Sequence, residues 1–148
     1  MAPGPDFAKQ AQDAINMKFA KGGDVSPAEA GLMACNLISH ASRGSADAQA
    51  GVAAVCRGTM QAMLLNSKDL PQTAMAILDA LPNVSLLTRV DPEKIMTWVL
   101  QGIAETMPAA GSVTQHSIQE KIEEQFMGVG AVFSSLCDDV RKKAQLQD

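Results

Sequence analysis

Apolar side chains recur every three to four positions through most of this 148-residue chain, and residues that start or stop helices bracket each apolar segment. The clearest start is Ser26-Pro27-Ala28-Glu29, where a capping hydroxyl precedes a first-turn proline and a glutamate follows three residues after the cap. Asp91-Pro92-Glu93 repeats the cap and the proline. Because an α-helix has about 3.6 residues per turn, this spacing puts apolar side chains on one helix face and predicts an all-α fold.

These start and stop residues divide the chain into five to six predicted helices within one domain that spans residues 1–148. Their approximate ranges are 6–21, 26–42, 46–66, 71–81, 92–107 and 113–144. Asp6 and Ser45 are the predicted caps of the first and third helices, and Leu32 is expected to face inward from the second. Pro82 is expected to break its helix or to begin a further turn, and the stretch 82–90 carries no clear pattern.

The range 113–144 is the longest, and we expect this C-terminal helix to run past the others in the bundle. Its apolar face is then a candidate surface for another protein or for a second copy in a homo-oligomer. The predicted contact residues are Phe126, Val129, Phe133 and Leu136. Gly128 and Gly130 lie within this range, and they indicate either a close helix crossing or a kink between two packing surfaces.

The composition of the chain disfavours several classes of function. A formal net charge of -4 disfavours nucleic acid or an anionic membrane as the main partner, and no apolar run is long enough to span a bilayer. The N-terminal residues lack the pattern of a signal peptide, so we expect a cytoplasmic protein. Three cysteines without a C-x-x-C pair predict free core thiols and no structural metal, and the nine methionines predict a Met-rich core.

One short string suggests a specific chemistry. His40-Ala41-Ser42-Arg43-Gly44-Ser45-Ala46 resembles the phosphorylated-histidine motif of bacterial histidine phosphotransfer domains. In that family a helical bundle exposes the histidine, a basic residue three positions on lies beside the phosphoryl group, and a glycine leaves room for the partner. The resemblance implies His40 as phosphoryl carrier and Arg43 as its electrostatic partner. The alternative is an ordinary turn at 43–45 after a solvated histidine.

No other pattern favours catalysis or a bound cofactor. There is no nucleophile elbow, and Glu120, Glu123 and Glu124 lack the Glu-x-x-His pairs of di-metal bundles, so we expect them on a solvated helix face. The leading hypothesis is a non-catalytic module for protein–protein interaction or self-association. Two alternatives stay open: phosphotransfer through His40, and a helical bundle that holds an apolar ligand among its methionines.

Overall fold

The chain forms only α-helices and loops in the residues that the computed structural model describes, 6–44 and 47–146. The seven helices within these ranges are α1 (Phe7–Ala20), α2 (Pro27–Gly44), α3 (Ala48–Leu65), α4 (Leu70–Thr88), α5 (Pro92–Ala110), α6 (Ser112–Gln125) and α7 (Val129–Leu146). The prediction of an all-α fold is confirmed, although the count of five to six helices is too low.

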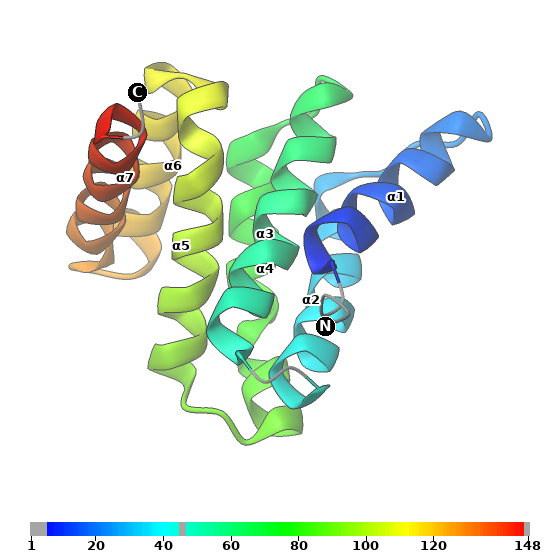
Figure 1. The fold of residues 1–148 in the computed structure, drawn as a ribbon, viewed down its shortest axis with the longest axis horizontal. Coiled ribbons are helices and arrows are strands. Elements are labelled where there is room, and N and C mark those ends of the chain that lie inside the picture. Colours follow the sequence, from blue (N-terminus) through cyan, green and yellow to red (C-terminus); the bar gives the residue numbers. More distant parts are fainter. Residues whose placement is uncertain (1–5, 45–46, 147–148) are drawn as a thin grey trace.

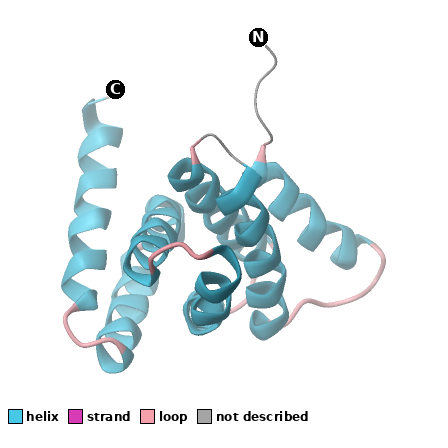
Figure 2. Cartoon of the chain, turned by 90° about the horizontal axis from the view of Figure 1, so that it is seen from below, coloured by secondary structure: helices cyan, strands magenta, loops and turns pink. Residues whose placement is uncertain are grey.

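The helices stack in two layers, and every helix except α6 packs most extensively on a helix two places away in the sequence, whereas α6 packs about equally on α7 and α4. In the odd layer α1 packs on α3, α3 on α5 and α5 on α7, while in the even layer α2 packs on α4 and α4 on α6. Figure 1 shows the array running from α1 and α2 at one end to α6 and α7 at the other, and Figure 2 shows the loops that join successive helices. Such a stack buries a continuous core between neighbouring helix pairs.

Aspartate and serine side chains start most of the helices, as the sequence indicates. Asp6 accepts a hydrogen bond from the Lys9 backbone N–H at 3.0 Å, and Ser26 accepts one from that of Glu29 at 3.1 Å. The cap of α3 is Asp47, whose Oδ1 accepts from the N–H of Ala50. The predicted cap Ser45, and residue 46 at the predicted start of that helix, lie outside the described residues.

Glycines permit the closest helix crossings. A Cβ on Gly102 of α5 would lie 2.7 Å from the Cβ of Cys56 on α3, and one on Gly58 of α3 would lie 2.8 Å from the Cα of Ala8 on α1. In the even layer a Cβ on Gly31 would lie 2.8 Å from the Cβ of Ala76. A larger residue at any of these positions would push the backbones apart, so the layer spacing depends on them.

The core is aliphatic and rich in methionine. Met60, Met63 and Met107 are fully buried, as expected for flexible side chains that fill gaps between helices. The prediction that Leu32 faces inward is wrong, because its side chain is 68% exposed. The face of α2 that packs on α4 carries Gly31 instead, which explains why Leu32 turns away.

The helix α4 does not end at Pro82, where the sequence predicted either a break or the start of a further turn. It continues to Thr88 because Leu81 and Val84, on either side of the proline, are both buried and hold the second half of the helix on the core. Arg89 then ends it in a left-handed conformation, with its N–H donating to the carbonyl of Ser85 at 2.8 Å. Packing therefore overrides the local cost of the proline.

The prediction of one long C-terminal helix over residues 113–144 is wrong. The segment divides into α6 and α7 at residues 126–128, where Gly128 has a φ of +90°, and α7 folds back against α6 and α5 (Figure 1). The carboxylate of Glu123 accepts hydrogen bonds from the N–H groups of Gly128 at 2.9 Å and Gly130 at 3.1 Å, which stabilises the start of α7. Gly128 thus makes the turn, and Gly130 makes the close crossing with α6.

No helix within residues 6–44 and 47–146 is both long and apolar enough to cross a membrane.

Candidate functional site

The four apolar residues predicted to contact a partner all pack inward. Phe133 is fully buried, while Phe126, Val129 and Leu136 are half-buried and pack against the core. They face inward because α7 closes the end of the array instead of extending past it. Of the four, Phe126 also borders an open cavity.

That cavity, the apolar hollow, has a volume of about 490 Å³ and lies where α4, the start of α5 and the end of α6 meet. Most of its surface is aliphatic, aromatic or proline carbon. Its lining residues are Leu78, Asp79, Leu81, Pro82, Ser85, Leu86, Pro92, Met96, Gln125 and Phe126. This volume is within the usual range of ligand cavities, roughly 300–1,000 Å³.

The polar groups at the apolar hollow already bond to one another or to the backbone. Gln125 donates from Nε2 to Oδ1 of Asp79 and so links α6 to α4, and Ser85 donates from Oγ to the carbonyl of Val90 at 2.6 Å. What the hollow offers to a ligand is therefore mainly apolar contact. At its edge Leu86 is 80% exposed, and its neighbour in the chain Leu87 is 69% exposed.

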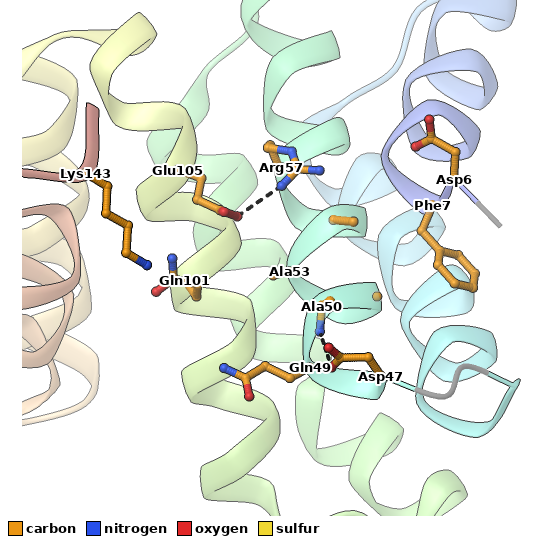
Figure 3. Close-up of a pocket in the computed structure, with 12 residues that line it drawn as sticks. Asp6, Phe7, Asp47, Gln49, Ala50, Ala53, Arg57, Gln101, Glu105 and Lys143 are labelled. Atoms are coloured by element: carbon orange, nitrogen blue, oxygen red, sulfur yellow. Dashed lines mark hydrogen bonds and ion pairs between the residues drawn. The ribbon is translucent and has the colours of Figure 1, made fainter. Parts of the chain in front are cut away.

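A second, more polar groove of about 810 Å³ crosses the odd layer (Figure 3). Its floor consists of small residues at the start of α3: Ala50, Gly51, Ala53 and Ala54. Polar side chains surround that floor from all four odd helices or their caps: Asp6, Asp47, Gln49, Arg57, Gln101, Glu105 and Lys143, with Phe7 beside them. We call this the polar groove.

Charges in the polar groove are unevenly placed. Arg57 and Glu105 form an ion pair at 3.2 Å between α3 and α5, which compensates both charges in the middle of the groove. The caps Asp6 and Asp47 lie toward α1, and Lys143 reaches in from α7 toward Gln101 at the other end (Figure 3). The carboxyl groups of Asp6 and Asp47 and the ammonium group of Lys143 therefore line opposite parts of the groove.

His40 is exposed on α2 and lines neither the apolar hollow nor the polar groove. The nearby Arg43 is also exposed, and its Nε donates to the carbonyl of Ser39 at 3.4 Å within the same helix. Gly44 is the last residue of α2, and the next two positions of the motif lie outside the described residues. The phosphotransfer hypothesis stays a prediction.

The three cysteines are buried free thiols that lie in α2, α3 and α7. Burial in apolar surroundings raises the pKa of Cys35 and of Cys137 to about 11, and that of Cys56 further still. Few thiolates form near neutral pH under these conditions, so the cysteines do not provide a reactive nucleophile. The described part of the chain also contains no group of three or more His, Cys, Asp or Glu side chains placed to hold a metal ion.

Sequence reasoning missed most of the apolar hollow and one capping residue. Leu86 and Met96 come from different helices, and nothing in the sequence indicates that Phe126 would lie beside them. Glu123 is exposed, as expected, but its carboxylate also caps α7, which was not expected. An acidic residue a few positions before a Gly-x-Gly turn was the available signal for that cap.

The chain matches no protein-family model, no curated protein and no solved structure among those with which it was compared.

Proposed function

We propose that this protein is a non-catalytic interaction module that binds the apolar face of a partner's amphipathic helix in the apolar hollow. The observation that carries the proposal is the hollow itself: an open, aliphatic cavity of about 490 Å³ with Leu86 exposed at its edge. Open apolar surface of this kind is costly in water, and covering it with a partner removes that cost.

The shape of the site favours a helix as the partner. The α4 residues along the hollow are spaced three to four apart, and a shallower hollow that shares Gln125 lies beside it, where Met75 is flanked by the polar side chains of Lys121 and Glu124. From Met75 to Leu86 the helix rises about 16 Å, which equals about three turns of a second helix laid alongside. Apolar anchors at positions i and i+3 or i+4 of the partner would meet the apolar hollow, and its next turn would pass Met75 between Lys121 and Glu124.

The experiment selects a displayed library of amphipathic helical peptides, each about three turns long, against the immobilised protein. We expect enriched peptides to bind Leu86→Asp at least tenfold more weakly than wild type, because a carboxylate at the edge must be desolvated when an apolar face covers it. Leu65→Asp is the matched control, since Leu65 is a similarly exposed leucine, at 76%, that does not line the hollow.

Two results would contradict the proposal. One is a selection that enriches no more peptides than a library whose apolar positions carry serine. The other is a set of peptides that binds the Leu86→Asp and Leu65→Asp variants equally well. Sedimentation of the free protein tests the other partner that the sequence suggested, because a dimer broken by Leu86→Asp would make a second copy the occupant.

A further inference from the structure

Asp79 is the one ionisable side chain among the described residues that line the apolar hollow. It lies one helical turn from Met75 and one from Pro82, on the face of α4 that leads to Leu86. We infer that the partner helix carries a lysine or arginine at the border of its apolar face, and that this cation pairs with Asp79. The inference rests on the proposed function, because it names the chemistry of the helix that binds in the hollow.

The carboxylate of Asp79 keeps acceptor capacity for such a cation. Its Oδ1 accepts the hydrogen bond from Nε2 of Gln125, and its Oδ2 accepts none from the described residues 6–44 and 47–146. An ionised carboxylate has about four lone-pair sites on its two oxygens. An ammonium or guanidinium group can therefore bond to Oδ2 without displacing Gln125.

No cation from the described part of the chain compensates Asp79. The ion pairs between described residues join other side chains. In the shallower hollow alongside, Lys121 and Glu124 flank Met75 with opposite charges, which offset each other. Among the residues that line the two hollows, the unbalanced charge is therefore that of Asp79.

A partner that covers the hollow takes water away from this carboxylate. Asp79 is exposed in the free protein, so its charge is solvated until the partner binds. A carboxylate that loses water without gaining a cation raises the free energy of the complex, and an ion pair offsets that cost. Asp79 therefore selects, among amphipathic helices with the same apolar face, those with a basic border over those with a neutral or acidic one.

The spacing along α4 sets the place of the cation in the partner. Asp79 and Leu86 are about 10 Å apart along the helix axis, which is about two turns. A helix laid alongside α4 therefore presents its basic residue about two turns from the anchor that contacts Leu86. Lysine and arginine reach a charge from the edge of an apolar face while their carbon stems stay on that face.

The test uses the library of amphipathic helical peptides, with the positions that border the apolar face varied among lysine, arginine, glutamate, glutamine and serine. We expect lysine or arginine to be enriched at a border position about two turns from the anchor that meets Leu86. Asp79→Asn removes the charge but keeps an oxygen that accepts from Gln125, and it should weaken the enriched peptides about three- to fivefold.

Reversal of the charge sharpens the test. Asp79→Lys should weaken the enriched peptides about tenfold, because an attractive pair becomes a repulsive one. A peptide whose basic border residue is replaced by glutamate should bind Asp79→Lys better than it binds the wild-type protein. Equal binding of that peptide to the two proteins would overturn the inference.

Asp13→Asn is the matched control, because Asp13 is an exposed aspartate within α1 that does not line the hollow, and the change in net charge is the same. Equal effects of Asp79→Asn and Asp13→Asn, or no enrichment of basic residues, would overturn the inference. If Leu86→Asp still weakens the peptides in that case, the proposed function stands. Peptides that do not distinguish Leu86→Asp from Leu65→Asp would overturn the proposed function and the inference together.

Discussion

The α3–α5 crossing and the α6–α7 hairpin both bring helix backbones close together, but different groups hold them there. At the first crossing Gly102 meets Ala53 and Cys56, all of them buried. At the second, Gly130 meets the side chain of Glu123, whose carboxylate also accepts two backbone N–H groups. Apolar packing therefore sets the spacing in the middle of the array, and polar capping sets the fold-back at its end.

The position of α7 against the array depends on both polar and apolar contacts. Its turn is held by Glu123, and Arg141 near its far end donates to the side chain of Gln115 on α6. Between these polar contacts, Phe133 and Cys137 are buried against the rest of the array. Because α7 carries Lys143 into the polar groove, its position also determines whether that groove is complete.

The largest effect is expected when the apolar part of the α7 contact is removed. Phe133→Ala should lower the free energy of unfolding by about 3–5 kcal/mol, because it leaves a cavity where a fully buried ring had been. Chemical denaturation measures the change. Val132→Ala is the control, since Val132 is 44% exposed and its truncation should change stability by no more than about 0.5 kcal/mol. Equal effects of the two variants would mean that Phe133 is not in the core.

A smaller effect is expected at the α3–α5 crossing. Gly102→Ala adds a methyl group 2.7 Å from the Cβ of Cys56, and overpacking should outweigh the gain in helix propensity by about 2 kcal/mol. Thermal or chemical unfolding reports the difference. Gly51→Ala is the comparison variant, in which the new methyl would lie 3.1 Å from the side chain of Ala41. It should lower the free energy of unfolding by less than half as much. A stabilising Gly102→Ala would mean that the helices cross farther apart.

The smallest effect is expected from the polar cap. Glu123→Ala should destabilise the protein by about 1 kcal/mol, since two N–H groups at the start of α7 lose their acceptor. Hydrogen exchange should show the loss concentrated in α7, because the cap acts locally. Glu124→Ala removes the adjacent carboxylate, which caps no helix, and should leave exchange in α7 unchanged. Identical hydrogen-exchange profiles for Glu123→Ala and Glu124→Ala would show that Glu123 does not cap α7.

The starts of α1, α2 and α5 were predictable because their signals are local. Asp6, Ser26 and Asp91 lie next to the residues that they cap, so a few positions of sequence contain the whole interaction. The continuation of α4 past Pro82 was not predictable in this way. It depends on the burial of Leu81 and Val84 by helices that are distant in the sequence.

The division of the C-terminal segment was hidden by a continuous apolar pattern. Ile118 and Ile122 on α6, and Phe133 on α7, all face the core, because α7 folds back with its apolar side inward. The spacing therefore looks like that of one helix. Gly128 and Gly130 are the signals of the turn, and a kink at these glycines is one of the two interpretations that the sequence permits.

The candidate site was predictable at one residue only. Phe126 was identified from its place on an apolar face, and it does border the apolar hollow. The rest of the hollow comes from α4 and α5, and the polar groove comes from four helices, so both exist only because helices distant in sequence are stacked. A one-dimensional pattern contains no information on which faces of different helices meet.

The most direct test of the fold-back of α7 is the rate at which a thiol reagent labels Cys137 in the native protein, measured by mass spectrometry beside Cys35 and Cys56. Burial raises the pKa of Cys137 from 9.0 to about 11, so near neutral pH its thiolate fraction should fall about a hundredfold, and burial of the sulfur slows access further. We expect Cys137 to label at least about a hundredfold more slowly than in the unfolded chain. Labelling at the rate of an exposed thiol, with Cys56 still protected, would show that α7 does not pack on the array and would contradict the account.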